Sequence, residues 1–332
     1  MKSTVIGGGS WGTALASVLC DKGPVKLWAR DPAIVTGIQS QRHNPRYQSE
    51  FRLPEHLEAT NDLGVALKDT QLVCVVVPSH AMRAVMTEAA PYLRPGVPII
   101  SASKGIENST LMTMEEVLCD VLPPEFRSDL CFLSGPSFAR ETLAKMATAV
   151  TIASRLPSVA QIVQEAFSTP YFRVYTTEDV TGVEMGGALK NVVAIAAGCV
   201  DGLGLGHNTM AALLTRGLAE ITRLAVARGA NPLTLSGLSG MGDLVLTCTG
   251  RLSRNRTVGY KLGQGCALQD ILRDMSEVAE GVRTTKSAYD LARQENVEMP
   301  IVNEVYQILY NGKPGNEAVA DLMGRRLKRE RA

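Results

Sequence analysis

The chain has 332 residues, the length of about two average domains, and 45% of them are hydrophobic while 20% are charged. This composition indicates a soluble globular protein with a large core. The formal net charge of +1 excludes recruitment of nucleic acid or a membrane surface by the field of the whole protein, so an anionic ligand has to be bound by local groups.

The cysteines and histidines argue against further kinds of site. The seven cysteines include no C-x-x-C pair, which favours reduced thiols in the cytoplasm over a disulfide framework or a zinc site. We expect no metal, because no ligand spacing with Cys, Asp or Glu is formed by His43, His56, His80 and His207. Glycines interrupt the apolar N-terminal stretch, so we expect no signal peptide, and no apolar run reaches the length of a membrane span.

The first predicted elements are a buried strand over residues 4–6 and a helix over residues 13–19. Between them, Gly7, Gly9 and Gly12 fit the pattern G-x-G-x-x-G. In this pattern the first glycine permits a tight turn, the second lets the backbone approach a pyrophosphate, and the third lets the helix pack on the strand. The free N–H groups at the helix start then face the phosphates. The sequence therefore predicts a dinucleotide site, although another kind of α/β protein can contain such a turn.

A second strand is predicted over residues 25–28, and the residues after it bear on cofactor choice. NAD-binding proteins commonly place an acidic residue at the end of this strand to hold the ribose hydroxyls. Here Ala29 and Arg30 occupy that place, and a guanidinium can pair with a 2′-phosphate. We therefore expect NADP(H) to be preferred over NAD(H). Asp31 keeps NAD(H) possible, and an ordinary Arg-Asp surface turn remains an alternative.

The rest of the first half alternates between strands and helices. After a polar, irregular stretch over residues 33–61, we expect helices over 62–68, 81–92 and 112–122 and strands over 72–77, 97–102, 130–134 and 148–153. Such alternation is typical of a doubly wound, mostly parallel sheet. From about residue 180, apolar residues recur at three- and four-residue spacing, which predicts consecutive helices. We therefore expect an α/β domain over residues 1–180 and an all-α domain over residues 181–332.

A lysine in the first of these helices is a candidate for chemistry. Lys190 shares a helix face with small or apolar residues, namely Gly186, Gly187, Val193, Ala194 and Ala197. An unpaired ammonium there is unfavourable, and partial burial lowers its pKa to a value that suits proton transfer near neutral pH. The two glycines would leave room for a substrate. A lysine that extends its head group to solvent fits the same spacing, and both interpretations stay open.

A second cluster follows the glycines at 240 and 242. Ser253, Arg254 and Asn255 together form a plausible pocket for a phosphate dianion. Asp243 lies among apolar residues and could orient a lysine. The alternative is a solvated, charged loop in which Ser253 caps the start of a helix. No G-x-S-x-G pattern supports a hydrolase.

Seven short motifs follow one another along the chain, at residues 7–14, 103–105, 135–139, 189–191, 242–248, 253–256 and 280–282. In this order they resemble the bacterial NAD(P)-dependent sn-glycerol-3-phosphate dehydrogenases over essentially the whole chain. The resemblance implies reversible reduction of dihydroxyacetone phosphate to sn-glycerol 3-phosphate, which supplies phospholipid synthesis in the cytoplasm. It also implies a Rossmann domain, a helical substrate domain of the 6-phosphogluconate dehydrogenase type, a cleft between them, and a homodimer.

The resemblance also implies roles for individual residues. Lys190 would donate and accept the proton, with Lys104 stabilising the carbonyl oxygen and Asp243 as a third catalytic residue. The cofactor would be held by Gly7, Gly9, Ser10, Trp11, Gly12, Arg30, Lys104, Ala139, Arg254, Val278 and Glu280. The substrate would be held by Lys104, Gly135, Ser137, Lys190, Asn191, Asp243, Thr247, Ser253, Arg254 and Asn255.

Two other functions remain as alternatives. A β-hydroxyacid or ketopantoate-type dehydrogenase shares the plan of a Rossmann domain, a helical domain and a helix lysine, but it needs a carboxylate site where this chain has residues 253–255. A non-catalytic NADP sensor would bind cofactor and signal to a partner, and the presence of Lys190, Lys104 and Asp243 together speaks against it.

Overall fold

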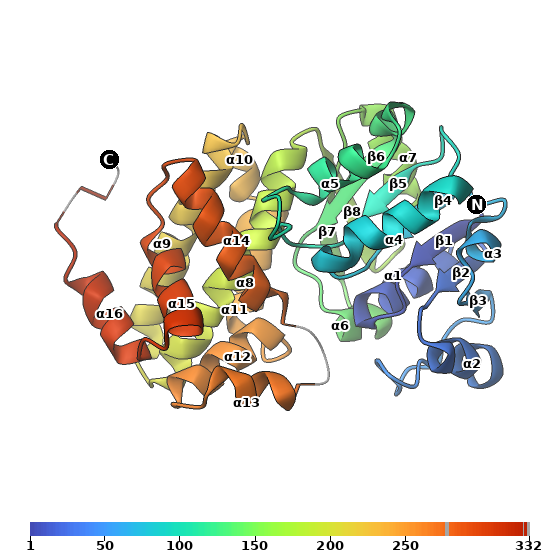
Figure 1. Ribbon diagram of the computed structural model, residues 1–332. Coiled ribbons are helices and arrows are strands. Elements are labelled where there is room, and N and C mark those ends of the chain that lie inside the picture. Colours follow the sequence, from blue (N-terminus) through green and yellow to red (C-terminus); the bar gives the residue numbers. More distant parts are fainter. Residues whose placement is uncertain (276–278, 328, 331–332) are drawn as a thin grey trace.

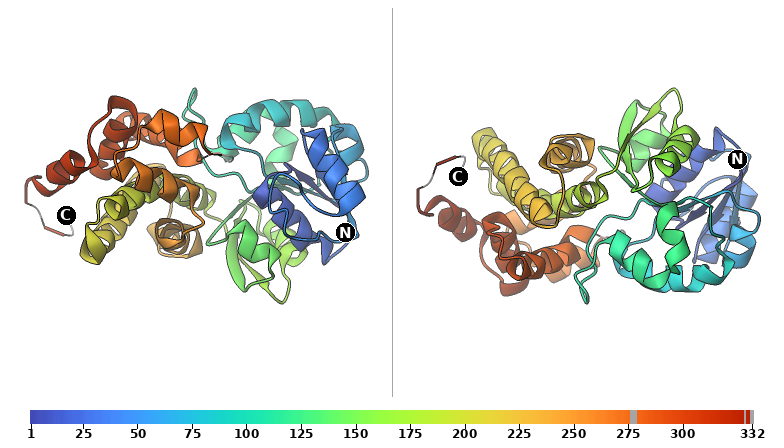
Figure 2. Two further views of the ribbon diagram at one scale, coloured as in Figure 1. Left: turned by 90° about the horizontal axis from the view of Figure 1, so that it is seen from below. Right: turned by 90° about the horizontal axis from the view of Figure 1, so that it is seen from above.

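Figure 1 shows the computed structural model, which describes residues 1–275, 279–327 and 329–330. An α/β part that contains the N-terminus lies beside an all-helical part that leads to the C-terminus. The views from below and from above show the same two parts side by side, with residues 315–323 at the end of the helical part away from the sheet (Figure 2). The molecule therefore has two lobes, and a site between them can draw residues from both.

One eight-stranded sheet organises the α/β part of the described chain. Its order is β3-β2-β1-β4-β5-β6-β7-β8, and neighbouring strands are parallel except for β6 and β7. The expected doubly wound, mostly parallel sheet is confirmed. Because β1 lies between β2 and β4, the chain changes direction across the sheet at β1, where ligands bind in such folds. The strands are β1 (Ser3–Ile6), β2 (Val25–Trp28), β3 (Leu57–Thr60), β4 (Leu72–Val75), β5 (Ile99–Ser101), β6 (Leu130–Ser134), β7 (Thr148–Ala153) and β8 (Phe172–Thr177).

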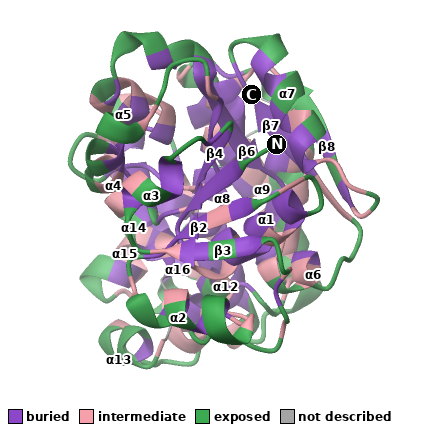
Figure 3. Ribbon diagram, turned by 90° about the vertical axis from the view of Figure 1, so that its right-hand side faces the viewer, coloured by how far each residue is buried: buried purple, intermediate pink, exposed green. Residues whose placement is uncertain are grey.

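Helices cover both faces of this sheet, and Figure 3 shows its buried strands between more exposed helices. One apolar core packs α1, α2 and α7 on the sheet, while the other packs α3, α4 and α5 on the opposite face. The elements are α1 (Ser10–Cys20), α2 (Pro32–Gln41), α3 (Leu63–Leu67), η1 (Ser79–Ala81), α4 (Met82–Ala89), η2 (Ala90–Tyr92), α5 (Met114–Val121), η3 (Pro124–Asp129), α6 (Ala139–Leu143) and α7 (Pro157–Phe167).

The expectation of an irregular stretch over residues 33–61 was wrong at both of its ends and holds for residues 42–56 between them. This stretch contains most of α2 and all of β3, which pairs with β2 at the edge of the sheet. Asp31 caps α2 by accepting a hydrogen bond from the N–H of Ala33 at 2.9 Å, and Pro32 occupies the first turn. These are ordinary helix-start signals. The alternating residues of β3 are too few and too mixed in polarity to stand out in the sequence.

The second part of the chain contains only helices and connecting loops among its described residues, as expected. A separate apolar core joins α8 to the helices that surround it. The elements are α8 (Val180–Gly202), α9 (Gly206–Ala227), α10 (Pro232–Leu235), the short π-helix η4 (Leu238–Gly242), α11 (Asp243–Thr249), α12 (Arg254–Gly263), α13 (Leu268–Arg273), α14 (Glu280–Gln294), α15 (Pro300–Asn311) and α16 (Gly315–Met323).

Helix α8 is the central element of this part. By length and composition it could cross a membrane, so the expectation that no segment reaches this length was wrong. However, 89% of its most apolar 18-residue window is buried inside the protein. A helix that is apolar on all sides is expected at the centre of a helical core, because every face packs against a neighbour.

Glycines set the distance between α8 and α12. A Cβ atom at Gly198 would collide with the carbonyl oxygen of Arg256, and one at Gly259 would collide with the carbonyl oxygen of Ile195. The two helix backbones are therefore in direct contact, which only glycine permits. This contact brings the first residues of α12 next to the middle of α8, where Lys190 lies.

Candidate active site

The turn between β1 and α1 has three glycines with three different surroundings. Gly7 has a φ of +127° and lies against the carbonyl oxygen of Val76, while Gly12 lies against the carbonyl oxygen of Gly7. Gly9 is the N-cap residue of α1, and a Cβ atom there would meet nothing within 4 Å. Side chains at the first and third positions would therefore disrupt the turn. The open space at Gly9 leaves the start of α1 accessible to a pyrophosphate.

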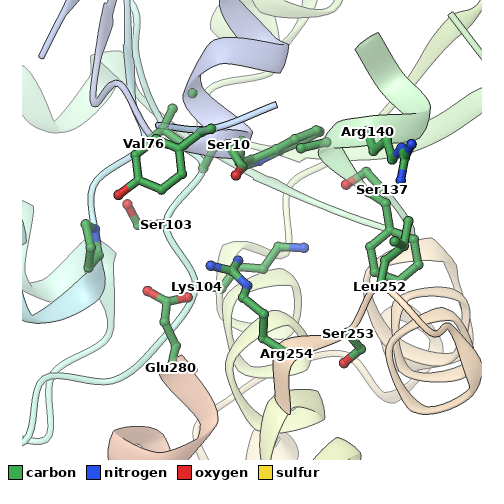
Figure 4. Close-up of a pocket in the computed structure, with 18 of the residues that line it drawn as sticks. Ser10, Val76, Ser103, Lys104, Ser137, Arg140, Leu252, Ser253, Arg254 and Glu280 are labelled. Carbon is green, nitrogen blue, oxygen red and sulfur yellow. The ribbon is translucent and has the colours of Figure 1, made fainter. Parts of the chain in front are cut away.

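A cavity of about 540 Å³ opens at this turn and extends between the two parts of the protein. Its volume is in the range of small-molecule sites, about 300–1,000 Å³. Figure 4 shows Lys104 and Arg254 in this cavity, with Ser10 on one side and Glu280 and Ser253 on the other. The expected site residues that line it are Gly9, Ser10, Trp11, Gly12, Lys104, Ser137, Ala139, Lys190, Asn191, Thr247, Ser253, Arg254, Asn255 and Glu280.

Two lysines from different lobes meet at one buried carboxylate. Lys190 of α8 pairs with Oδ1 of Asp243, and Lys104, from the loop after β5, donates to Oδ2 at 2.6 Å. Lys190 also donates to Oγ1 of Thr247 at 2.7 Å, which in turn donates to the Asp243 carbonyl oxygen at 2.6 Å. Lys190 is 6% exposed and Asp243 is 1% exposed. The lysine therefore does not extend its head group to solvent, because Asp243 supplies the counter-charge.

Burial and pairing shift the ionisation of this cluster. Burial lowers the pKa of Lys190 to about 8, although the neighbouring Asp243 opposes the shift. Burial alone would raise the pKa of Asp243, but Lys104 and Lys190 together hold it below its usual value. Asp243 is thus ionised near neutral pH while Lys190 is close to its titration point. An amine with such a pKa can either donate or accept a proton.

The glycines beside Lys190 do not make room for a substrate in the expected way. A Cβ atom at Gly186 would lie 2.6 Å from the carbonyl oxygen of Ser239, and one at Gly187 would lie 2.8 Å from Oγ of Ser134. Both glycines therefore allow close packing of α8 on the protein. The two glycines therefore serve packing, and Lys190 itself lines the cavity.

The start of α12 combines a helix cap with polar groups at the cavity. Oγ of Ser253 accepts a hydrogen bond from the N–H of Arg256 at 3.3 Å, so Ser253 caps the helix as well as lining the cavity. Asn255 donates to Oδ1 of Asn191 at 2.9 Å and accepts from the N–H of Gly281 at 2.9 Å. Arg254 is exposed at the cavity. A rigid amide and a guanidinium therefore lie next to each other, an arrangement that suits a phosphate.

Some expected site residues lie elsewhere. Gly7, Asp243 and Gly135 do not line the cavity. Gly7 packs against the carbonyl oxygen of Val76, and Asp243 pairs with the two lysines. The carbonyl oxygen of Gly135 accepts a hydrogen bond from Lys104 at 3.4 Å. Arg30 is exposed and does not line the cavity. Val278 lies outside the described residues.

Glu280 connects the lobes at the cavity. It begins α14 and accepts a hydrogen bond from the N–H of Ser79 at 3.2 Å, and burial raises its pKa. The expected residue thus joins the start of η1 to the helical lobe.

A further segment that lines the cavity was not predicted from the sequence. Tyr47, Gln48 and Glu50 line the cavity, and Glu50 forms an ion pair with Arg140 of α6 at 3.3 Å. Asn44, which is completely buried, holds this segment by donating to the carbonyl oxygen of Gly8 at 2.9 Å. The segment belongs to the stretch that was expected to be irregular, and no residue pattern in it indicates the site.

No metal site is evident in the described part of the chain. No group of three or more His, Cys, Asp or Glu side chains there is placed to hold a metal ion.

One family of known proteins matches most of the chain. A model of the NAD-dependent glycerol-3-phosphate dehydrogenase N-terminus matches residues 2–160, and the model of the C-terminus matches residues 179–320. A glycerol-3-phosphate dehydrogenase [NAD(P)+] of Myxococcus xanthus is 57% identical over 335 residues, which cover 100% of this chain and 99% of that protein. The corresponding protein of Geobacter sulfurreducens is 57% identical over 328 residues and 98% of each chain.

Solved structures extend the comparison to the fold. The crystal structure of glycerol-3-phosphate dehydrogenase from Coxiella burnetii has a TM-score of 0.92 at 38% identity, covering 98% of this chain and 99% of that chain. A ketopantoate reductase from Ralstonia eutropha covers 96% of this chain and 100% of that chain with a TM-score of 0.61 at 15% identity. The second likeness concerns the fold alone.

Proposed function

The chain belongs to the NAD-dependent glycerol-3-phosphate dehydrogenase family, and from this premise we propose how its cleft performs the reaction. The protein is an NAD(P)-dependent oxidoreductase that acts on a small phosphorylated substrate. The proposed reaction is the reversible reduction of dihydroxyacetone phosphate to sn-glycerol 3-phosphate, with Lys190 as general acid and base. The observation that carries this assignment is the pairing of Lys190 and Lys104 with the two oxygens of Asp243 at the cavity.

Lys190 acts on the oxygen of the ketone. A bound nicotinamide would supply the hydride, and negative charge would develop on the carbonyl oxygen of the ketone. Lys190 supplies a proton to that oxygen and takes it back in the reverse direction. Lys104 stabilises the developing charge, and Asp243 and Thr247 hold the Lys190 ammonium in place.

The start of α12 binds the phosphate of the substrate. Arg254 and Asn255 provide a charge and an amide next to the cavity, and Asn191 fixes the amide of Asn255. Binding at the phosphate fixes the reacting carbon near Lys190, so binding energy from a remote group contributes to the rate. Gly135, Ser137 and Ser253 complete the proposed substrate contacts.

The turn at Gly9 fits the pyrophosphate of the cofactor, and the end of β2 favours NADP(H) in this proposal. Asp31 is already occupied, because it caps α2 and pairs with Arg46 at 3.2 Å. Arg30 is exposed beside it and can approach a 2′-phosphate. The remaining proposed cofactor contacts are Ser10, Trp11, Gly12, Lys104, Ala139, Arg254 and Glu280, which line the cavity, together with Gly7 and Val278.

The wider setting of the enzyme is also proposed from the family. We place the boundary between the cofactor domain and the substrate domain at residues 180 and 181. We further propose a cytoplasmic homodimer whose product supplies glycerophospholipid synthesis. Measurement of the molecular mass in solution tests the dimer. Expression of the gene in cells that lack this dehydrogenase tests whether its product supplies glycerophospholipid synthesis.

One set of assays tests the proposed reaction. The purified protein is expected to oxidise NADPH, and more slowly NADH, with dihydroxyacetone phosphate but not with 2-ketoacids. Lys190→Ala is expected to lower turnover on the order of 10²–10⁴-fold, the usual contribution of a general acid or base, while cofactor binding persists. Lys286→Ala, which changes an exposed lysine of α14, is the matched control. Turnover within a few-fold of the parent in Lys190→Ala contradicts the assignment.

A further inference from the structure

The peptide between Gly8 and Gly9 lies where the glycine turn enters α1. Three consecutive glycines, at positions 7 to 9, give this stretch more backbone freedom than other residues would. The next peptide is held by the helix, because the carbonyl oxygen of Gly9 accepts the N–H of Thr13 at 2.9 Å. The peptide between Gly8 and Gly9 precedes the helix, so its orientation depends on contacts with other parts of the chain.

Asn44 supplies such a contact from the segment that follows α2. It is completely buried, and its Nδ2 donates to the carbonyl oxygen of Gly8 at 2.9 Å and to Oγ1 of Thr13 at 2.8 Å. Its Oδ1 accepts the N–H groups of Arg46 and Tyr47, both at 3.1 Å. The amide therefore uses both of its donor hydrogens and both lone pairs of its oxygen.

Only one orientation of this amide fits its partners. The Gly8 carbonyl can only accept a hydrogen bond, and the backbone N–H groups of Arg46 and Tyr47 can only donate one. A rotated amide would place oxygen against oxygen at Gly8 and hydrogen against hydrogen at the two N–H groups. Leaving these buried groups unpaired is unfavourable. Asn44 therefore holds the Gly8 carbonyl in one direction.

The direction of the Gly8 carbonyl sets that of the Gly9 N–H. The described residues contain no cis peptide bond, and in a planar trans peptide the C=O and the N–H point in opposite directions. With the carbonyl turned to Asn44, the N–H of Gly9 therefore points away from the buried amide. Asn44 does not line the large cavity, whereas Gly9 and Ser10 do. Figure 4 shows Ser10, the residue after Gly9, at the edge of this cavity.

We propose that Asn44 is a positioning residue that directs the N–H of Gly9 at the cofactor pyrophosphate. This inference rests on the proposed binding of NAD(P)H at the glycine turn. A peptide that rotates freely would at times present the Gly8 carbonyl to the phosphates, and the negative end of its dipole would repel them. The bond from Asn44 prevents this rotation before the cofactor arrives, so binding orders fewer groups and is tighter.

The test compares Asn44→Asp with Thr13→Val, two buried substitutions of nearly unchanged shape. In Asn44→Asp the carboxylate still accepts the N–H groups of Arg46 and Tyr47, and the Thr13 hydroxyl can turn to donate to it. The carboxylate cannot donate to Gly8, so two oxygens repel each other there. Thr13→Val removes the hydroxyl that accepts from Asn44 and keeps the bond to Gly8. The two variants thus affect different bonds of one amide.

Titration of the fluorescence of NADPH and NADH with each variant measures the expected difference. Asn44→Asp should raise the Kd of both cofactors about 10- to 100-fold, the effect of losing one hydrogen bond to a charged group. Its kcat at saturating cofactor should be nearly unchanged, since the lysine cluster is not altered. Thr13→Val should lower the free energy of unfolding but leave both Kd values unchanged. Equal increases of Kd in the two variants would indicate a merely structural role and overturn the inference.

Further measurements separate the hydrogen bond from the added charge and from the proposed function. Asn44→Ala removes the bond to Gly8 without a new charge, so its Kd values should also rise, and unchanged values overturn the inference. Asn44→Ala replaces Asn44→Asp if the latter does not fold. A rise for NADPH alone would overturn it too, because the pyrophosphate is common to both cofactors. Failure of the proposed function would appear instead as a parent protein that binds neither cofactor or does not reduce dihydroxyacetone phosphate.

Discussion

The two walls of the large cavity use different kinds of interaction. On the wall formed by β1 and α1, backbone atoms determine the shape. Gly7 and Gly12 pack against carbonyl oxygens, and Gly9 leaves helix N–H groups accessible. On the opposite wall, Lys190 and Asp243 are buried side chains that stabilise each other's charge. The first wall is defined by a short local sequence, whereas the second depends on partners 53 residues apart. Substitutions should therefore affect the first wall through shape and the second through charge.

The largest effect is expected for Asp243→Asn. The variant leaves the ammonium groups of Lys190 and Lys104 without their carboxylate, so turnover should fall on the order of 10²–10⁴-fold. The pKa of Lys190 should fall further, since burial remains and the opposing charge is removed. Steady-state kinetics over a range of pH measures both effects. Thr247→Val, which removes a neutral hydrogen bond to the same lysine, should lose less activity. Equal losses in the two variants would contradict the idea that the charge of Asp243 matters more to Lys190 than the hydrogen bond of Thr247.

Arg254→Ala tests the phosphate contact on the same wall. Loss of one charge-assisted hydrogen bond costs about 1.5–3 kcal/mol, so KM for dihydroxyacetone phosphate should rise about 10- to 100-fold. Because Arg254 is also a proposed cofactor contact, the assay uses saturating cofactor, and the unphosphorylated ketone should then be reduced equally by the variant and the parent. Arg251→Ala, an exposed arginine outside the cavity, serves as the control. A similar loss with both ketones would remove Arg254 from the phosphate site.

Two glycine substitutions compare positions within the backbone wall. Gly12→Ala forces a Cβ atom against the carbonyl oxygen of Gly7, so the free energy of unfolding should fall by about 1–3 kcal/mol or more. Gly9→Ala meets no atom within 4 Å and should leave stability nearly unchanged while it raises KM for the cofactor. Denaturant unfolding and cofactor kinetics measure the two effects. Equal destabilisation by both substitutions would contradict the distinction between a packed position at Gly12 and an open position at Gly9.

The smallest effect is the pH dependence of the unmodified enzyme. In the proposed mechanism ketone reduction uses the ammonium form of Lys190, so its rate should fall as pH rises above about 8, the pKa of this group. Alcohol oxidation requires the neutral amine, so its rate should rise through the same pH range. Rate constants of the two directions, measured at saturating substrate, provide the comparison. If both directions respond to pH with the same sign, Lys190 is not the group that titrates.

The sequence predicted the local features of the fold better than the distant ones. The strand and helix around Gly7, Gly9 and Gly12 and the long helix around Lys190 were visible as short-range patterns. Elements β3 and α2 were missed because Pro45 and Pro54 and many polar residues conceal them. The antiparallel pairing of β7 with β6 was not predicted either, since strand direction depends on the connection through space rather than on composition.

The candidate site shows the same limit. The motifs around residues 190 and 254 indicated chemistry, and Asp243 was considered as a partner for a lysine, but the sequence did not show that one carboxylate holds two lysines. The contact of α12 with α8 at Gly198 and Gly259 brings these distant segments together, and such a contact has no signature within either helix. The burial of Asp243 likewise could not be predicted, because it depends on distant segments that pack around this residue.

The hydrogen bond from Lys104 to Asp243 has a mechanical consequence. Lys104 belongs to the sheet lobe and Asp243 to the helical lobe, so the bond crosses the boundary between them. Any hinge motion that spreads the lobes must stretch this bond and leave a carboxylate with one cation instead of two. If these residues act as proposed, this bond would hold the lobes together, and the groups for proton transfer would be in place only while the lobes are closed.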